Sequence, residues 1–240
     1  MKVIDIFFPS NIKCIFCGDE DYKHGICDKC LENLPYIKGR TCVKCGGHVL
    51  KDEIICHECE KNEHAFHSSY ALFDYDGDIK IKINQFKQSG AKYLGHTFAH
   101  MLSDFYEKLD MKVDLILPMP IHPNRLKERG FNQSELLCEV IAKNHPKLVN
   151  KDLLIRIKDT PHQTGLNRDN RLMNLSNAFE ITNLKKVRNK RILIIDDIYT
   201  TGSTLDECAF TLLKAGAKSV IGLCLARGLV YDNDAEQLAR

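Results

Sequence analysis

The stretch from Ile192 to Leu205, ILIIDDIYTTGSTL, limits the folds open to this chain more than any other. Its first four residues, Ile192 to Ile195, are all apolar, which is typical of a short strand buried in a parallel sheet. An acidic pair, Asp196 and Asp197, comes next, and a turn of small hydroxyl residues follows it. Helical spacing of apolar residues begins at Leu205. A strand, an acidic pair, a hydroxyl-rich turn and a helix together predict an α/β fold.

This unit carries groups that suit a phosphorylated sugar. The free N–H groups and partial positive charge of a helix N-terminus favour an anion, and a glycine lets the backbone approach it closely. Asp196 and Asp197 would repel a phosphate, but they suit a sugar diol or a hydrated Mg²⁺. The alternative is an ordinary strand–turn–helix without a ligand, and the absence of Gly-Lys-Ser/Thr excludes a P-loop. The candidate phosphate-binding residues are Thr200, Thr201, Gly202, Ser203 and Thr204.

Eight of the 11 cysteines form four Cys-x-x-Cys pairs within residues 1–60. Each pair can present two thiolates to one ion, and two pairs complete a tetrahedral zinc site. We therefore expect a double zinc ribbon with two structural Zn²⁺ sites; a redox motif would not need four copies. Sequential and cross-braced pairing both remain open. The predicted ligands are Cys14, Cys17, Cys27, Cys30, Cys42, Cys45, Cys56 and Cys59, whereas Cys138, Cys208 and Cys224 fall in apolar patterns typical of buried residues.

Length and composition restrict the class of protein. The 240 residues can hold one ordinary domain and a small module. A net charge of +2 does not by itself indicate nucleic-acid binding, and residues 1–60 hold 8 Lys and Arg against 10 Asp and Glu. The apolar stretch Ile4 to Phe8 is too short for a signal peptide, and no run has the length of a membrane span. We expect a soluble cytoplasmic protein.

A second short strand is predicted from Val113 to Leu117, followed by Pro118-Met119-Pro120 and a basic loop. A loop that follows a parallel strand lies at the C-terminal edge of the sheet, where α/β ligand sites form. Arg125, Lys127 and Arg129 give this loop a cationic character that suits a pyrophosphate, although a basic surface loop is the alternative. Asn132 is expected to cap the next helix.

A third strand is predicted from Leu153 to Ile157, and a long polar segment separates it from a strand at 178–181. Residues 151–191 hold 10 Lys and Arg against 4 Asp and Glu, a local balance of +6. Long polar loops in compact domains are usually functional or disordered. Arg168 and Arg171 would share a face if their segment is helical, and such cations suit a departing pyrophosphate. A solubilising loop is the alternative.

The segment 61–111 predicts one strand in SSYALFDYDG and helices at Ile79–Phe86 and Leu94–Tyr106. Lys87 lies between those helices, and contact with a phosphate or base and solvation in a turn are equally compatible with its place. A last strand is expected from Val220 to Leu225.

The order of these motifs resembles known proteins. The turn after the acidic pair resembles the phosphoribosyl pyrophosphate (PRPP) loop of type I phosphoribosyltransferases. The whole order, over about residues 5–228, resembles the ComF family of phosphoribosyltransferase-like proteins associated with bacterial competence for DNA uptake. Its specific motifs are PMP with RGFNQ, the series Thr160, Gln163, Arg168, Arg171 and Asn174, and the paired zinc ribbons. The sequence shows neither the N-terminal nucleophile cysteine nor the glutaminase domain of glutamine amidophosphoribosyltransferase, so we expect that it does not draw ammonia from glutamine.

The resemblance implies a type I phosphoribosyltransferase fold over residues 61–240, a parallel sheet flanked by helices, with a hood placed in 61–111. Asp196 and Asp197 would hold the ribose diol of PRPP and orient Mg²⁺, and the turn would bind its 5′-phosphate. Met119 to His122 and Arg129 would line the pyrophosphate pocket, and the closing lid would use Arg156, Lys158, Arg168 and Arg171.

Two functions follow as hypotheses. The first is transfer of phosphoribose with release of pyrophosphate, to an acceptor that the sequence does not identify, in DNA uptake. The second is a non-catalytic PRPP or nucleotide sensor whose ribbons dock another DNA-uptake protein. A basic lid favours catalysis, since a sensor needs none. Direct binding of single-stranded DNA would call for a basic groove with exposed aromatic residues, a pattern that the ribbons lack.

Overall fold

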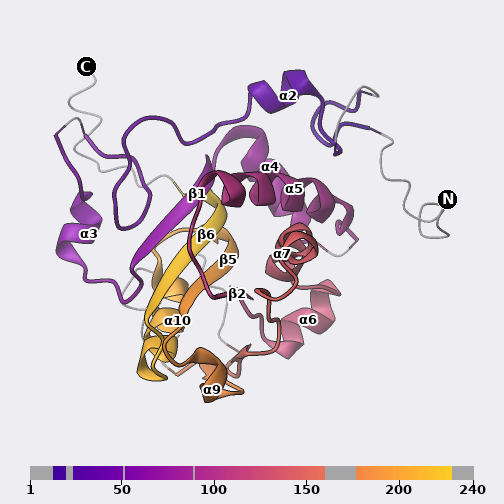
Figure 1. The fold of residues 1–240 in the computed structure, drawn as a ribbon. Coiled ribbons are helices and arrows are strands. Elements are labelled where there is room, and N and C mark those ends of the chain that lie inside the picture. The colour runs from indigo at the N-terminus through magenta and orange to yellow at the C-terminus, as the bar shows by residue number, and fades with distance from the viewer. Residues whose placement is uncertain (1–12, 20–23, 51, 89, 160–176, 229–240) are drawn as a thin grey trace.

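In the computed structural model, a sheet of four parallel strands forms the centre of the molecule (Figure 1). The structure describes residues 13–19, 24–50, 52–88, 90–159 and 177–228. The strands lie in the order β1-β6-β5-β2, and all three pairings are parallel. Their bounds are β1 Ser68–Asp74, β6 Ser219–Arg227, β5 Arg191–Tyr199 and β2 Leu115–Pro118. The predicted parallel sheet is confirmed.

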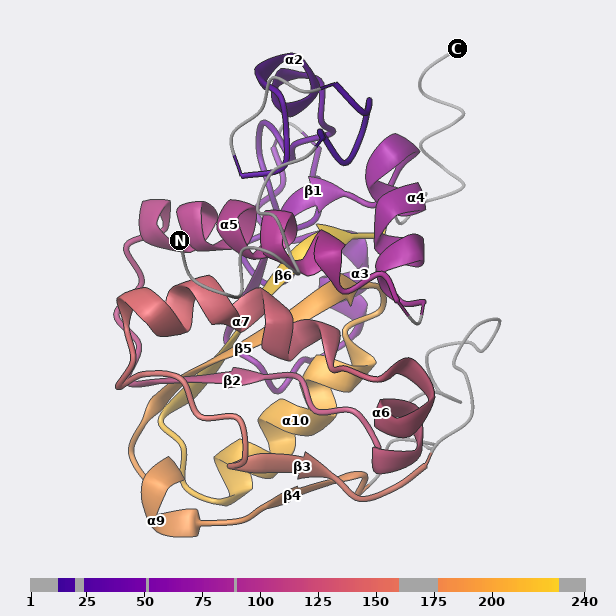
Figure 2. The same cartoon turned by 90° about the vertical axis from the view of Figure 1, so that its right-hand side faces the viewer.

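Helices cover both faces of this sheet (Figure 2). Three of them pack on one face, α4 (Gly77–Phe86), α5 (Tyr93–Lys108) and α7 (Gln133–Asn144), and α10 (Ser203–Lys214) packs on the other. The side chains of β5 alternate between the two cores: Leu193 and Ile195 join the first, and Ile192 and Ile194 the second. This alternation explains the unbroken apolar run, because a strand covered on both faces needs no polar positions. Within the described ranges, no helix has the length and apolar character needed to cross a membrane.

The remaining elements correct two sequence-based predictions. The predicted strand at Leu153–Ile157 exists as β3 (Leu154–Arg156), but it pairs antiparallel with β4 (Phe179–Ile181) in a separate two-stranded sheet. A further helix, α9 (Leu184–Val187), follows β4. The segment predicted as a basic loop contains a helix, α6 (Pro123–Arg129). Its signals are a capping His122, a proline in its first turn and Gly130 at φ +81 after its end.

The segment 61–111 contributes an edge strand to the main sheet and two helices to the core on one of its faces. Its strand β1 pairs with β6 at the sheet edge, and α5 packs on α7. The short helices α2 (Asp28–Glu32) and α3 (His57–Lys61) belong to the cysteine-rich region before it. The boundary after residue 60 and the hood at 61–111 stay predictions.

Phe98 tests how far the fold depends on the α5 core. Its side chain is fully buried against Phe86, with ring centroids 5.6 Å apart. We expect Phe98→Ala to lower the free energy of unfolding by about 3–5 kcal/mol, because a buried phenyl group leaves a cavity. Phe210→Ala on α10 is the matched control, since Phe210 is 57% exposed, and it should change stability by no more than about 0.5 kcal/mol. Urea unfolding measures both, and similar values for the two variants would contradict this account of the core.

Candidate functional site

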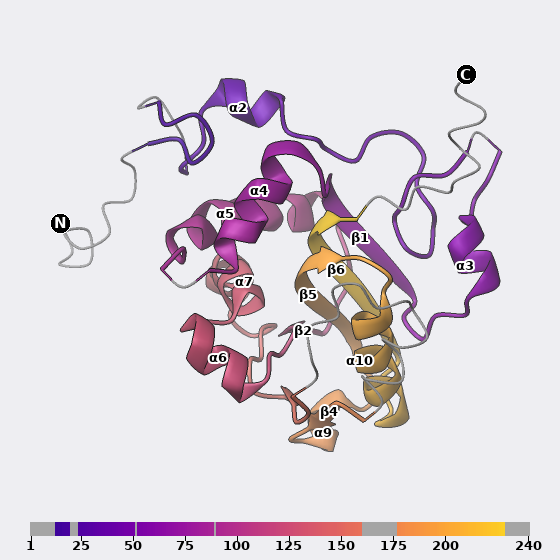
Figure 3. The same cartoon turned by 180° about the vertical axis from the view of Figure 1, so that it is seen from behind.

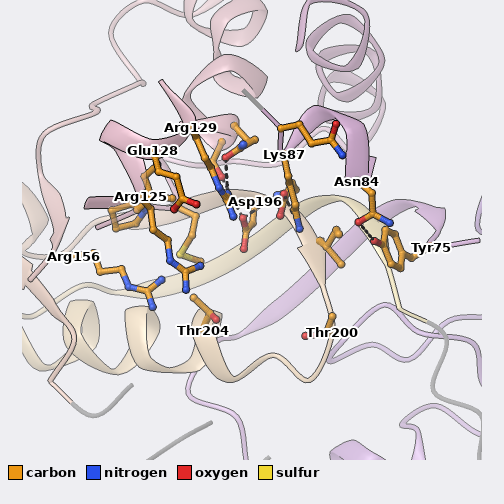
Figure 4. A pocket seen from close by; sticks show the side chains of 18 residues that line it. Tyr75, Asn84, Lys87, Arg125, Glu128, Arg129, Arg156, Asp196, Thr200 and Thr204 are labelled. Carbon is orange, nitrogen blue, oxygen red and sulfur yellow. Dashed lines mark hydrogen bonds and ion pairs between the residues drawn. The ribbon is translucent and has the colours of Figure 1, made fainter. Parts of the chain in front are cut away.

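The site lies where β5 ends. Two helices, α7 and α10, pack against β5 from opposite faces of the sheet. In α/β proteins, ligand sites form at the carboxyl end of a strand where the flanking helices change from one face to the other. Because the strands are parallel, the residues after β1, β2 and β5 meet at the same edge. A cavity of about 800 Å³ opens there (Figure 4).

The acidic pair forms the floor of this cavity. Both Asp196 and Asp197 lie within β5, which continues to Tyr199, rather than after it. One oxygen of Asp196 accepts hydrogen bonds from the backbone N–H of Asp197 at 2.8 Å and from the Ser134 hydroxyl at 3.2 Å. The ammonium of Lys87 lies 3.1 Å from a carboxylate oxygen of Asp197. Three separate segments, β5, α7 and the end of α4, therefore meet at the pair.

Burial changes the protonation of these groups. Desolvation, and then the charge of Asp197, raise the pKa of Asp196 to about 7, against the opposing effect of its hydrogen bonds and of Lys87. Burial alone would lower the pKa of Lys87, but the attraction of Asp197 and Asp196 outweighs it and raises that pKa. Lys87 is thus a permanent cation at neutral pH, whereas Asp196 exchanges its proton there.

The predicted phosphate-binding turn joins β5 to α10. Gly202 precedes the helix at φ +78, a left-handed conformation that glycine adopts without strain. Thr200 and Thr204 line the large cavity, and a small cleft beneath it is lined by these two residues with Gly202 and Ser203. Thr201 lines neither space, and its hydroxyl lies 2.9 Å from that of Ser203. The helix N-terminus and its hydroxyl groups face the same space as the acidic pair.

Arginines form the wall opposite Lys87 (Figure 4). Arg125 and Arg129 come from α6 and Arg156 from β3. Burial, and then the nearby charge of Arg125, lower the pKa of Arg156, as expected where two guanidinium groups face one space. Such a wall is suited to an anion carrying more than one charge.

The remaining predicted residues differ in their placement. Met119 and Pro120 line the cavity, and the Asn132 side chain holds this segment by donating to the Met119 carbonyl at 3.0 Å. Lys158 does not line it; its carbonyl accepts a hydrogen bond from Arg156 at 3.3 Å. Arg168 and Arg171, and with them Thr160, Gln163 and Asn174, lie outside the described residues.

Sequence reasoning missed part of the lining. The sequence is compatible with either a ligand contact or a solvated turn for Lys87, and the structure places its ammonium beside Asp197. Ser134 was not singled out, although it follows Asn132 and Gln133 at the start of α7. Tyr75 and Asn84 line the cavity end nearest Lys87 and are joined by a 2.7 Å hydrogen bond. The RGFNQ motif ends at Gln133, the first residue of α7, and Ser134 is the next residue in that turn. This motif was therefore the available signal for Ser134.

The eight paired cysteines form two clusters in sequential order, one from the first two pairs and one from the last two. In each cluster all four sulfur atoms lie within 4.8 Å of one another. The Cys45 and Cys56 sulfur atoms are 3.5 Å apart and those of Cys17 and Cys27 are 3.6 Å apart, near the roughly 3.8 Å edge of a tetrahedron with Zn–S bonds of about 2.3 Å. Both clusters therefore fit Zn²⁺, and the cross-braced pairing is ruled out.

The sheet, the loop at its edge and the paired cysteine clusters define an α/β protein of the phosphoribosyltransferase type with a double zinc ribbon. Family models agree: a double zinc ribbon domain matches residues 3–60, and a phosphoribosyl transferase domain matches residues 150–238. Competence protein F of Haemophilus influenzae is 30% identical over 230 residues, which cover 90% of this chain and 97% of that protein. The chain belongs to the competence protein F family, the ComF family, as its motifs predicted.

Other relatives have similar coverage. Competence protein ComFC of Bacillus subtilis is 29% identical over 84% of both chains. DNA utilization protein YhgH of Escherichia coli K12 is 29% identical over 85% of this chain and 91% of that one. Among solved structures, a glutamine PRPP amidotransferase from B. subtilis reaches a TM-score of 0.36 at 14% identity, covering 54% of this chain and 26% of that one. An orotate phosphoribosyltransferase from Francisella tularensis reaches 0.34 at 16% identity, covering 64% and 73%.

The raised pKa of Asp196 makes stability depend on pH. In the unfolded chain an aspartate titrates near pH 4, so between about pH 4 and pH 7 the folded state holds a proton that the unfolded state releases. The free energy of unfolding should therefore fall as pH rises through this window. Asp196→Asn cannot ionise, so its stability relative to wild type should increase from about pH 5 to about pH 7 and then level off.

Urea unfolding at several pH values measures this difference. Asp114→Asn is the control, because hydrogen bonds from Arg191 hold the pKa of Asp114 far below this range. Its difference from wild type should stay constant over the same window. Parallel curves for wild type and Asp196→Asn would show that the Asp196 carboxyl is not protonated near neutral pH.

Proposed function

We propose that this protein binds PRPP with Mg²⁺ and transfers its phosphoribosyl group to a nucleophilic acceptor, releasing pyrophosphate. One observation carries the proposal: a single cavity unites the acidic pair, the N-terminus of α10 and the arginine wall. PRPP has the matching order of groups, with a 5′-phosphate, a ribose diol and a pyrophosphate.

Each part of the ligand has a counterpart in the cavity. The turn Thr200 to Thr204 offers backbone N–H groups and hydroxyls to the 5′-phosphate, and its helix adds a partial positive charge. Asp196 and Asp197 accept hydrogen bonds from the ribose hydroxyls. The pyrophosphate then meets the guanidinium groups, which bind phosphate oxygens in pairs. The residues of this last subsite are Met119, Pro120, Arg125, Arg129 and Arg156.

The acidic pair also fits Mg²⁺. Asp197 already attracts a cation in this structure, the Lys87 ammonium at 3.1 Å, and carboxylate oxygens are the ligands that Mg²⁺ prefers. Asp196 and Asp197 would hold the ion, directly or through water. When bound, Mg²⁺ supplies positive charge that neutralises the pyrophosphate.

The residues of the cavity act on the breaking bond. The bond from C1 of ribose to the pyrophosphate oxygen breaks, and its electron pair leaves with the pyrophosphate. Arg125, Arg129 and Arg156 would stabilise that growing charge, which is the larger part of the catalysis we propose. The acceptor forms the new bond to C1 and gives up a proton to solvent or to a cavity base. Lys87 cannot be that base, because its raised pKa keeps it protonated.

The names of the relatives suggest a biological setting. They are called competence proteins or DNA utilization proteins, so we propose that this chain acts in DNA uptake or use, with other proteins of that process as partners. We place it in the cytoplasm, where a reducing environment keeps zinc-binding cysteines from forming disulfides.

PRPP binding tests the acidic pair. Replacing both residues, Asp196→Asn and Asp197→Asn, should weaken PRPP binding at least about tenfold in the presence of Mg²⁺, because hydrogen bonds to charged groups contribute about 1.5–3 kcal/mol each. Isothermal titration measures this. Asp114→Asn is the control that should bind like wild type, because Asp114 precedes β2 and its side chain contacts Arg191 at the opposite end of β5 from the acidic pair. Equal affinities in wild type and the double variant, both folded, would remove the pair from the site.

The arginines predicted as a lid separate an enzyme from a sensor. Interactions that strengthen only in the transition state raise turnover more than affinity. Arg168→Ala with Arg171→Ala should therefore reduce pyrophosphate release roughly a hundredfold, by analogy with the loss of an oxyanion donor, and change PRPP affinity much less. Pyrophosphate release over a panel of candidate acceptors measures turnover. A sensor would show the opposite, a loss of affinity with no turnover in either protein.

A further inference from the structure

The two zinc ribbons are attached to opposite sides of the sheet. The first ribbon, Cys14 to Cys30, places Cys14 and Cys27 in the core that contains α5, and α2 lies over α4 and α5 in Figures 1 and 3. The second ribbon, Cys42 to Cys59, places Cys42 and Cys45 in the core of α10. This second core also contains Tyr199 and Leu205, which flank the phosphate-binding turn. Of the two ribbons, the second is therefore the one in contact with the core that contains the residues flanking the phosphate-binding turn.

A buried arginine joins the second ribbon to the turn. Arg227, at the end of β6, is 6% exposed and donates a 3.0 Å hydrogen bond to the Cys45 carbonyl. Its guanidinium carbon lies 4.5 Å from the centre of the Tyr199 ring. Four thiolates around one Zn²⁺ carry a net charge of two minus, so a buried cation beside them balances charge that water cannot reach. Arg227 thus contacts both the ribbon and the residue that ends β5.

Two glycines make this contact close. A side chain on Gly47 would lie 2.5 Å from the Arg227 guanidinium, so the ribbon backbone packs directly on it. A side chain on Gly202 would collide with the Tyr199 hydroxyl, so Tyr199 lies directly under the phosphate-binding turn. Cys45, Arg227, Tyr199 and Gly202 therefore form a continuous series of contacts.

A second connection reaches the other end of the turn. His64, five positions after the last cysteine of the second ribbon, places its ring nitrogen 2.6 Å from an Asp206 carboxylate oxygen. The backbone N–H of Ala65 donates to the other oxygen at 2.9 Å. The two side chains are 1% and 7% exposed. Asp206 lies in the first turn of α10 and its own N–H donates to Gly202, so this pair fixes the helix N-terminus.

We propose that the second zinc ribbon holds the phosphate-binding turn in its binding conformation, with Arg227 and Asp206 as positioning residues. Zinc in this ribbon and a phosphate ester at the turn then stabilise each other, whereas zinc in the first ribbon has no such effect. The proposal rests on the proposed function only in taking PRPP as the ligand of the turn. Coupling between two sites is reciprocal, so each ligand must raise the affinity for the other by the same factor.

Matched ligand substitutions test the coupling in the full-length chain. Cys59→Ser removes the last ligand of the second ribbon, and Cys30→Ser removes the last ligand of the first. Zinc content should be two ions in wild type and one in each variant. In Cys59→Ser, PRPP affinity measured with Mg²⁺ should fall roughly tenfold, a usual size for such coupling, whereas Cys30→Ser should bind like wild type.

Hydrogen exchange separates this proposal from the proposed function. Without any ligand, the backbone amides of residues 199–206 should exchange faster in Cys59→Ser and in Arg227→Met, but not in Cys30→Ser. If wild type fails to bind PRPP while this difference in exchange persists, the proposed function is wrong and the coupling stands. Unchanged exchange and affinity in Cys59→Ser would overturn the coupling.

The reciprocal experiment needs no substitution and so does not depend on a variant that folds. Wild-type protein is exposed to a zinc-selective chromogenic chelator, with and without PRPP and Mg²⁺. PRPP should slow the release of one zinc ion, the one retained in Cys30→Ser, and leave the release of the other unchanged. Where titration shows that PRPP binds, slowing of both ions equally, or of neither, would contradict a specific link between the second ribbon and the turn.

Discussion

The site depends on one constraint: two adjacent carboxylates are partly withdrawn from water near the end of β5. Asp196 is half-buried and Asp197 is buried, so little solvent weakens the repulsion between them. Their compensation comes from Lys87 on one side and the Ser134 hydroxyl on the other. Because these groups belong to α4 and α7, the acidic pair ties together the helices on one face of the sheet.

The parallel arrangement of the strands explains why the charges meet in one place. Each strand of the sheet ends at the same edge, so the segment after β2 and the turn after β5 face each other. Arg156 joins them from β3, outside the parallel sheet. A carboxylate floor and a guanidinium wall, contributed by different elements of the fold, therefore line one cavity.

The zinc ribbons serve as extensions of the two cores. Segments as short as these bury too little apolar surface to fold alone, and a metal ion replaces the missing core. Four of their cysteines are nevertheless buried among the apolar residues of the sheet, Cys14 and Cys27 on one side and Cys42 and Cys45 on the other. The ribbons are thus packed on the sheet, and the second lies close enough to the phosphate-binding turn to influence it.

The features that the sequence predicted correctly are those encoded by neighbouring residues. The strand, acidic pair, turn and helix of β5 and α10 form one continuous stretch, and each Cys-x-x-Cys pair is a local signature of metal binding. Local signals were also present for α6, a capping histidine, a proline in the first turn and a following glycine, although a basic loop was predicted there. The family followed from the order of these local motifs.

The tertiary structure alone decided which distant segments meet. It paired the cysteines in sequence order, placed Lys87 on Asp197, moved β3 out of the parallel sheet to pair with β4, and brought Arg227 between Cys45 and Tyr199. In each case the local pattern was compatible with more than one partner. A buried charge takes the partner that the packing of helices and strands brings within a few ångströms, and local sequence patterns do not specify that packing.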